Sequence, residues 1–314
     1  MRPAPNTQPS HAPQADTTPA KAPHPERHDG AGVRIGVFDS GLGGLSVLKA
    51  LRAHLPEAEL LYVADSGHAP YGEREDSHIV ARAAHISDFL MAQGVDAIVV
   101  ACNTATAAAV SSLRQRCGDV PVIGVEPGVK PAVARSRHGR IGVLATPGTL
   151  SSLKFRHLVE RHAAGAQLTL QACPGLAKAI ESGDLQSPDV RDMVQRFAAP
   201  LREAKVDTVV LGCTHYPFVA EQFQAALGSD VDVIDTAEAV ALQTMRITAR
   251  HASIQPASPP DNNLPAERTS DRVRLWSSGD PRHLSRVAQA WLGLQTEAQA
   301  LPEREAKRPT CMDR

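Results

Sequence analysis

The chain has 314 residues, of which 42% are hydrophobic and 21% charged, and its formal net charge is -1. This length and composition indicate a globular protein with one large domain or two of ordinary size. The balanced charge excludes the basic surface of a dedicated nucleic-acid binder, and no apolar run is long enough to cross a membrane. We therefore expect a small-molecule partner, with neither nucleic acid nor a membrane.

Residues 1–32 contain seven prolines and, apart from Met1, no large aliphatic or aromatic side chain. Such a segment cannot bury enough apolar surface to offset its ordering entropy, so we expect a disordered N-terminal tail. A similar stretch at 255–271 predicts a loop insertion, and the charged residues 295–314 predict a frayed C-terminal tail.

Between these segments, short β-branched runs alternate with alanine- and leucine-rich stretches of helical length. This alternation predicts an α/β fold with mostly parallel sheets. Ligands bind beyond the carboxyl ends of such strands, where Asp39, Cys102, Thr146 and Cys213 lie. The expected buried strands, in chain order, are 34–40, 59–65, 96–102, 120–125, 140–146, 167–173, 207–213 and 231–236.

The chain also contains an internal repeat. "VDAIVVACN" at 95–103 matches "VDTVVLGCT" at 206–214, an offset of 111 residues that superposes Cys102 on Cys213. "RIGVFDSGLGG" from Arg34 matches "RIGVLATPGT" from Arg140 at an offset of 106. Chance similarity between hydrophobic strands is the alternative. Otherwise the repeat predicts two similar Rossmann-like α/β domains related by a pseudo-twofold axis, with the active site in the cleft between them.

The expected first domain comprises 33–130 plus 241–294, and the expected second domain comprises 131–240. Two strand-end thiols, Cys102 and Cys213, would then face one cleft from opposite walls. Such a pair fits inversion at a carbon, because one thiolate removes a proton from one face and the other thiol delivers one to the opposite face. For Cys102 alone, a packing role in the core is the competing interpretation.

Eight segments of the sequence resemble the glutamate racemases of the cofactor-independent aspartate/glutamate racemase superfamily. They follow the order of that family over nearly all of 34–293. In "TLSSLKFRHL", Phe155 stands where the family commonly has tyrosine, so no hydroxyl role is transferred there. The matching segments are "FDSGLGGLSVL" at 38–48, "APYGER" at 69–74, "VACNTATA" at 100–107, "GVEPGVKPA" at 124–132, "GVLATPGT" at 142–149, "CPGLAKAIESG" at 173–183, "LGCTHYP" at 211–217 and "SSGDP" at 277–281.

The resemblance implies that Asp39 assists the Cys102 thiol and contacts substrate together with Ser40. Helix capping is the alternative role for Asp39. The glycines of "DSGLGG" would let the backbone approach a ligand closely. Ser46 replaces the last glycine of a GxGxxG pattern, so we do not expect a bound nucleotide.

Polar residues directly follow the two cysteines and would open helices: Asn103 and Thr104 after the first, Thr214 and His215 after the second. Backbone N–H groups at a helix N-terminus favour a substrate carboxylate and a thiolate. His215 could also serve as the proton partner of Cys213.

Three further residues are assigned from the resemblance: it implies that Tyr71 and Gly72 contact substrate and that Glu181 assists the second cysteine. Thr146, which the offset of 106 residues relates to Ser40, should donate a hydrogen bond to substrate from the second half. The alternatives are a proline-initiated turn with a packed tyrosine, and a solvated helix-end charge at Glu181. The remaining cysteines, Cys117, Cys173 and Cys311, are interpreted as structural or incidental, because the spacing forms no CxxC pair, disulfide framework or zinc site.

Together, the resemblance implies a cytoplasmic enzyme that interconverts L-glutamate and D-glutamate and supplies D-glutamate for peptidoglycan. Cys213 would deprotonate L-glutamate and Cys102 D-glutamate, with no cofactor and no metal. The absence of a signal peptide agrees with a reducing cytoplasm and free thiols. An aspartate or hydantoin racemase, or a solute-binding module, is the alternative, and a homodimer stays open.

Overall fold

The structure, a computed structural model, describes residues 32–251 and 272–303, which belong to one compact unit beginning at Gly32. The expected tail at 1–32, apart from Gly32, lies outside the described residues. So do the expected loop insertion at 255–271 and residues 304–314 with Cys311.

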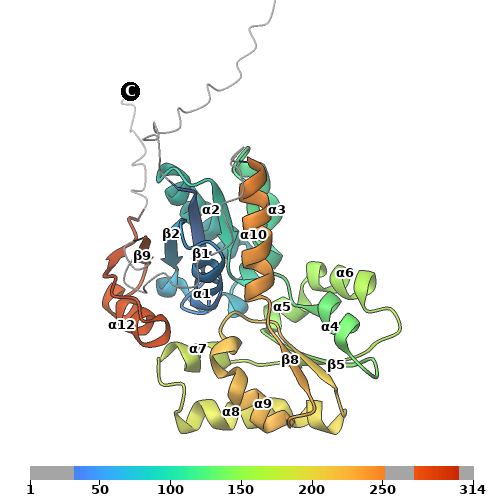
Figure 1. Cartoon of the computed structure of the whole chain (residues 1–314). Coiled ribbons are helices and arrows are strands. Elements are labelled where there is room, and N and C mark those ends of the chain that lie inside the picture. Colours follow the sequence, from blue (N-terminus) through green and yellow to red (C-terminus); the bar gives the residue numbers. More distant parts are fainter. Residues whose placement is uncertain (1–31, 252–271, 304–314) are drawn as a thin grey trace, which may run out of the picture. The chain divides into compact units, whose positions relative to one another are not determined.

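The described residues form two parallel sheets with helices around them, which confirms the predicted α/β fold. Figure 1 shows the strands of each sheet with their own helices. The larger sheet has six strands, in the spatial order β10 (Ala298–Ala300), β9 (Val273–Ser277), β2 (Glu59–Ala64), β1 (Arg34–Asp39), β3 (Ala97–Val100) and β4 (Val122–Gly124). The smaller has four, in the order β6 (Gln167–Ala172), β5 (Arg140–Ala145), β7 (Thr208–Leu211) and β8 (Asp232–Ile234).

The two sheets share one strand order and one register, as the internal repeat predicts. The order β2-β1-β3-β4 in the first corresponds to β6-β5-β7-β8 in the second. Ile35 of β1 pairs with Ala97 of β3, and Ile141 of β5 pairs with Thr208 of β7. These are the pairs that the offsets of 106 and 111 residues relate, so the two halves correspond residue by residue.

The helices follow the strands on both faces of each sheet. Four hydrophobic clusters fill the spaces between helices and sheets, two for each sheet. The helices are α1 (Leu45–His54), α2 (Asp76–Ala92), α3 (Asn103–Arg116), α4 (Val129–Arg135), α5 (Pro147–Ser151), α6 (Leu153–His162), α7 (Leu176–Glu181), α8 (Pro188–Glu203), α9 (Ala220–Leu227), α10 (Ala237–His251) and α12 (Pro281–Leu292). Three short 3-10 segments are η1 (Ser66–His68), η2 (Tyr71–Glu73) and η3 (Tyr216–Val219).

Three expectations about the chain's organisation need correction. The strand at 167–173 is not buried, because β6 forms the edge of its sheet and Leu170 is 47% exposed. The sheet continues past residue 294, since β10 pairs with β9, a strand that the sequence analysis did not include. Helix α4 spans the expected boundary at 130, yet its Val129 and Ala132 belong to the core of the smaller sheet. We therefore propose that the first domain ends before Val129.

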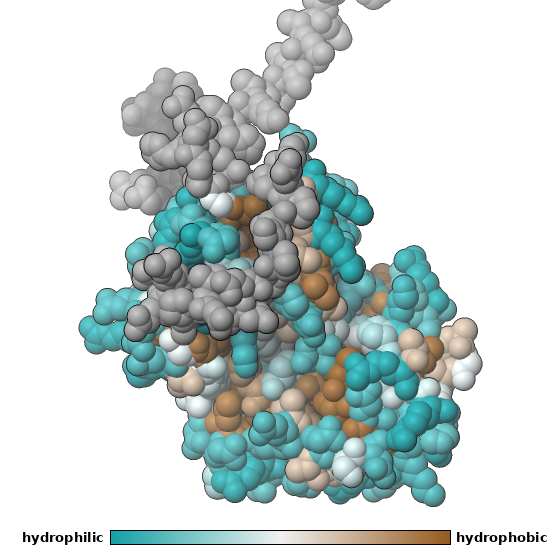
Figure 2. Space-filling view, in the orientation of Figure 1, coloured by the Kyte–Doolittle hydropathy of each residue, from teal (hydrophilic) through white to brown (hydrophobic). Residues whose placement is uncertain are grey.

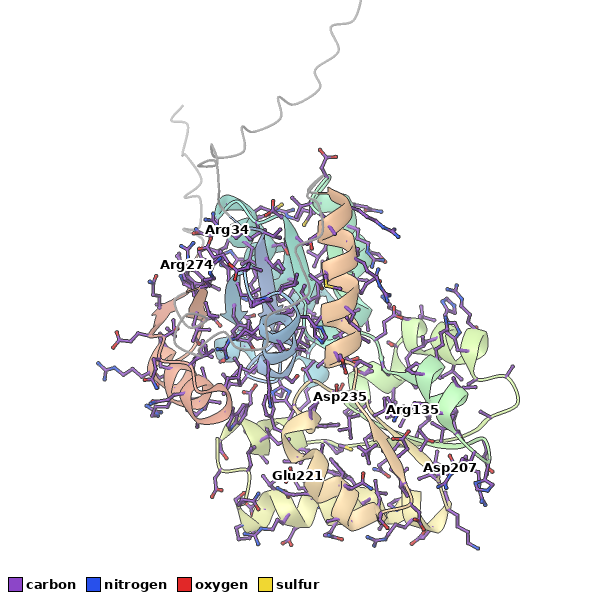
Figure 3. The ribbon with its side chains drawn as sticks, viewed as in Figure 1. Arg34, Arg135, Asp207, Glu221, Asp235 and Arg274 are labelled. Atoms are coloured by element: carbon purple, nitrogen blue, oxygen red, sulfur yellow. The ribbon has the colours of Figure 1, made fainter. Side chains whose placement is uncertain are left out.

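Charged side chains pair at the amino ends of the strands. Arg34 and Arg274, labelled in Figure 3, both bond to Glu59 at the start of β2, with 2.6 Å between Arg34 Nε and Glu59 Oε2. In the smaller sheet, Arg135 pairs with Asp232 at the start of β8.

The surface in Figure 2 is mostly hydrophilic, with smaller hydrophobic areas. Only Leu153 and Leu170 are large hydrophobic side chains with high exposure among the described residues. Within the same residues, none of the helices has the length and apolar character needed to cross a membrane.

Candidate active site

A pocket of about 260 Å³ lies where the carboxyl ends of strands from both sheets meet. Its walls include both strand-end cysteines, so the structure brings together the residues that the repeat superposes. The lining residues are Ser40, Ser66, Ala69, Pro70, Tyr71, Gly72, Cys102, Asn103, Thr104, Thr146, Ala177, Lys178, Glu181, Cys213, Thr214 and His215.

Cys102 lies between β3 and α3 as the N-cap residue of that helix. Its Sγ accepts a hydrogen bond from the backbone N–H of Ala105 at 3.4 Å, and its S–H donates to Ser40 Oγ at 3.6 Å. Burial raises the pKa of the Cys102 thiol, and the nearby Asp39 carboxylate raises it further, against these two hydrogen bonds. The surroundings of Cys102 therefore favour the thiol form.

Asp39 ends β1 and is fully buried behind the pocket wall. Its carboxylate accepts hydrogen bonds from the backbone N–H groups of Ser40 at 2.7 Å and Gly44 at 2.6 Å, which fixes the turn that leads into α1. Burial raises the pKa of Asp39, although His215 and these N–H groups lower it in part. Asp39 is not among the residues that line the pocket, and its direct contact with substrate stays a prediction. Ser40 connects Asp39 to Cys102.

Cys213 has different neighbours. His215 Nδ1 lies 3.5 Å from Cys213 Sγ, and His215 Nε2 lies 2.8 Å from Glu181 Oε1. The N–H of Gly43 also lies 3.2 Å from Nε2. A ring nitrogen that bears a hydrogen can donate it but cannot also accept one from the Gly43 N–H. The contact with Glu181 is the shorter of the two, so we assign the hydrogen to Nε2, which donates it to the carboxylate. Nδ1 then faces the thiol.

Burial opposes the charged imidazole, but the Cys213 thiolate and the Glu181 carboxylate outweigh it and raise the pKa of His215 well above its usual value. Cys213 therefore has a buried imidazole within 3.5 Å and Cys102 does not, so the two thiols have different surroundings.

The glycines of "DSGLGG" allow this arrangement. A β-carbon at Gly41 would lie 1.7 Å from Glu181 Oε1, and one at Gly43 would lie 2.3 Å from His215 Nδ1. The N–H of Leu42 donates to Glu181 Oε1 at 2.8 Å. From the sequence alone, these glycines are expected to let a ligand approach the backbone closely. The structure instead shows close contact with side chains from the other half of the chain.

Three further polar residues of the pocket, Asn103, Thr104 and Thr146, lie at the starts of helices. Thr146 caps α5 by accepting from the N–H of Thr149, and its Oγ1 lies 3.0 Å from that of Thr104 in the other half. Asn103 opens α3, as expected. Thr214 and His215 do not open an α-helix, because the 3-10 segment η3 follows them before α9 begins.

Tyr71 lines the pocket, but its hydroxyl donates to the buried Asp65 at 2.5 Å. Asp65 also accepts two hydrogen bonds from Arg82, at 2.7 and 3.0 Å. The Tyr71 hydroxyl is therefore already used, which leaves the ring and the adjoining backbone to face a ligand. Gly72 contacts the second half, since a β-carbon there would lie 3.1 Å from Thr146 Cβ.

Most of the predicted residues meet in this pocket, and the sequence analysis missed five others: Ser66, Ala69, Pro70, Ala177 and Lys178. Lys178 stands three residues before Glu181 on α7, a spacing that places two side chains on one helix face and could have identified it. Cys117 and Cys173 are buried outside the lining, and burial raises the pKa of Cys173 to about 12. Among the described residues, no group of three or more His, Cys, Asp and Glu side chains could hold a metal ion.

Known proteins resemble this chain over most of its length. A family model described as Asp/Glu/Hydantoin racemase matches residues 45–244. The chain is 46% identical over 263 residues to a glutamate racemase of Ectopseudomonas mendocina, covering 84% of this chain and 96% of the relative. It is 47% identical over 253 residues to a glutamate racemase of Pseudomonas aeruginosa, covering 81% and 91%.

Solved structures agree. A crystal structure of a glutamate racemase isoform from Bacillus anthracis superposes with a TM-score of 0.75 at 32% identity, covering 87% of this chain and 98% of that one. A structure of Escherichia coli glutamate racemase in complex with L-glutamate and the activator UDP-MurNAc-ala has a TM-score of 0.73 at 29% identity, covering 86% and 98%. With two matching α/β halves and a shared pocket between paired strand ends, the chain belongs to the Asp/Glu/Hydantoin racemase family and is an isomerase, an amino-acid racemase.

Proposed function

We propose that this chain interconverts L-glutamate and D-glutamate without a cofactor, using Cys102 and Cys213 as the two bases. One observation carries the proposal: the two cysteines follow equivalent strands, β3 and β7, and line the same pocket. The substrate is supported by the relatives, which are named glutamate racemases. We further propose that the reaction takes place in the cytoplasm, where thiols stay reduced, and supplies D-glutamate for peptidoglycan.

In the direction from L-glutamate, the Cys213 thiolate acts first. It removes the α-proton, so the α-carbon–hydrogen bond breaks, an S–H bond forms and the electron pair stays on the α-carbon. His215 supports this step because its imidazolium, held by Glu181, stabilises the thiolate before substrate arrives. The observed contacts, 3.5 Å to the sulfur and 2.8 Å to the carboxylate, suit this role.

Cys102 completes the reaction from the opposite face. Its S–H bond breaks and a new C–H bond forms on the α-carbon, which inverts the configuration. Burial and Asp39 raise the pKa of Cys102, so the protonated form needed for this step is the favoured one. From D-glutamate the roles reverse. After either direction, exchange of thiol protons with water, or turnover in reverse, restores the starting protonation.

The pocket offers groups for the substrate's charges. The N-terminus of α3, at Asn103 and Thr104, favours a carboxylate and the negative charge that develops beside it on deprotonation. Asn103 Oδ1 and Ser66 Oγ are buried and have no hydrogen-bond partner among the described residues. A substrate ammonium provides the donors that Asn103 Oδ1 needs, and Ser66 can donate to a carboxylate.

The proposal is tested by incubating the purified protein separately with L-glutamate, L-aspartate and a 5-substituted hydantoin, and following optical rotation. Loss of rotation with glutamate alone supports it. Loss with one of the others assigns a different substrate within the family. Saturable binding of glutamate without turnover would indicate a solute-binding module. Turnover should survive chelators and carbonyl reagents and should be lost on thiol alkylation, with glutamate protecting.

A further inference from the structure

A histidine outside the pocket contacts the backbone of Glu181. His283 lies in the first turn of α12, directly after the "SSGDP" segment, and its Nε2 is 2.7 Å from the Glu181 carbonyl oxygen. A carbonyl only accepts hydrogen bonds, so Nε2 carries the proton. The guanidinium of Arg286 only donates, and its Nη2 lies 3.4 Å from His283 Nδ1. The contact with the Glu181 carbonyl therefore places a hydrogen on His283 Nε2, and Nδ1 faces the Arg286 guanidinium.

His283 contacts the end of helix α7, a helix that depends on its neighbours for stability. Helix α7 has six residues, Leu176–Glu181, which is too short to be stable from its own hydrogen bonds. The last four carbonyls of a helix lack donors within it, and Glu181 contributes one of these. The chain turns at Gly183, where φ is 93°, and a β-carbon there would lie 3.6 Å from Val287 of α12. Helix α12 thus contacts the last residue of α7 and lies close to the turn that follows it.

The Glu181 side chain links this contact to the thiol. Its Oε1 accepts from the N–H of Leu42 and from His215 Nε2, each at 2.8 Å, and His215 Nδ1 faces Cys213 Sγ. A shift of the last turn of α7 would move the carboxylate away from the imidazole. His283 does not line the pocket, so any effect it has on the reaction passes through Glu181.

We propose that His283 is a positioning residue, which holds the end of α7 so that Glu181 can orient His215 against Cys213. It acts on one of the two bases and leaves Cys102, at the start of α3, unaffected. The proposal rests on the proposed function, because it assumes that the arrangement of Glu181, His215 and Cys213 serves proton transfer. It adds that α12 serves the catalytic site from outside the pocket.

The test compares His283→Ala with His283→Gln, whose amide retains an N–H donor, and with Arg282→Ala. Arg282 is an exposed neighbour on the same turn, and it controls for disturbance of α12. The first readout is alkylation of Cys102 and Cys213 by iodoacetamide between pH 5 and 10, measured peptide by peptide. This readout needs no turnover. We expect His283→Ala to move the pH of half-maximal alkylation upward at Cys213 only, and His283→Gln to restore most of it.

The second readout is turnover. We expect His283→Ala to lower kcat for glutamate racemisation on the order of tenfold with little change in KM, since it weakens the general acid–base group without touching substrate. With β-chloroglutamate, elimination of HCl should slow from the enantiomer that Cys213 deprotonates and not from the other. The enamine formed hydrolyses to a 2-oxo acid and ammonia, which reports the rate.

An unchanged alkylation profile at Cys213, or an equal change at both cysteines, would overturn the role of His283. The two proposals fail separately. Wild-type protein that does not racemise glutamate contradicts the proposed function, whereas the alkylation profile still decides the role of His283. Active wild-type protein with an equally active His283→Ala variant contradicts only the positioning role.

Discussion

The carboxylate of Glu181 lies directly against the backbone of Gly41, although the two residues belong to different halves of the chain. A β-carbon at Gly41 would lie 1.7 Å from Glu181 Oε1, and the neighbouring Leu42 N–H bonds to the same oxygen. The loop after β1 therefore forms part of the surroundings of Cys213. Strand β1 itself pairs with β3, the strand that precedes the other cysteine, Cys102. Under the proposed mechanism, the activity of Cys213 therefore depends on contact between the two halves.

Gly41→Ala is expected to lower kcat/KM by about a hundredfold, because the carboxylate must move and general acid–base groups contribute on that scale. A double-mutant cycle with Glu181→Ala separates this clash from other effects. In the Glu181→Ala background, the added methyl group at Gly41 should cost little further activity. Equal losses in both backgrounds would show that Gly41 acts in some other way.

Replacing His215 by asparagine is expected to shift the pH dependence of racemisation. The pKa of His215 is raised well above its usual value of about 6.5, so its positive charge persists above that pH and favours the thiolate. Without it, an ordinary thiol ionises near pH 8.5, so the acidic limb of the pH–rate profile should move to higher pH. Initial rates from pH 5 to 10 measure this. A pH–rate profile that is lower at every pH but unchanged in shape would contradict the proposal that the charge of His215 favours the thiolate.

Lys178→Met is expected to raise KM for glutamate about tenfold with little change in kcat. Among the residues that line the pocket, Lys178 has the only ammonium or guanidinium group, and a charge-assisted hydrogen bond to a carboxylate is worth about 1.5 kcal/mol or more. The matched control is Lys130→Met, on the exposed face of α4 and outside the lining. A KM within twofold of wild type for Lys178→Met would exclude it as a specificity residue.

Arg82→Met is expected to destabilise the fold at neutral pH by about 3–5 kcal/mol, because it leaves the carboxylate of Asp65 buried without its cation. The control is Arg116→Met. The pair between Arg116 and Asp88 is partly exposed, and such surface pairs contribute about 1 kcal/mol or less. Urea unfolding at pH 7 measures the free energy of unfolding of both variants. An equal loss of stability in the two would contradict the buried role of the pair between Arg82 and Asp65.

The ion pair between Arg82 and Asp65 also predicts that the stability of the fold depends on pH in the acid range. Burial would raise the pKa of Asp65, but hydrogen bonds from Arg82, Tyr71 and Ser278 outweigh it and lower the pKa. A lowered folded-state pKa adds stability that is complete above the unfolded value of about 3.9 and is lost as the pH falls through the folded value. The stability difference between wild type and Asp65→Asn should therefore shrink below pH 4.

The sequence could predict strands β1 to β8 and the two cysteines because they depend on local patterns and, in part, on the repeat. Strand β9, although apolar, was not among the expected strands. Ile35 with Ala97, and Ile141 with Thr208, pair as the offsets require. Strand β10 lacked such a pattern, since "AQA" is neither apolar nor β-branched. The contacts of Gly41 with Glu181 and of His283 with Glu181 span more than 100 residues, and no local spacing encodes them.

The reaction in deuterated water tests the two-thiol mechanism most directly. If Cys213 removes the α-proton and Cys102 delivers another from the opposite face, early product from either enantiomer carries deuterium while unreacted substrate carries little. Mass spectrometry of both glutamate pools at low conversion gives the two values. Protium retained in the product, together with deuterium appearing in the remaining substrate, would indicate a single base serving both faces and would contradict the assignment of Cys102 and Cys213.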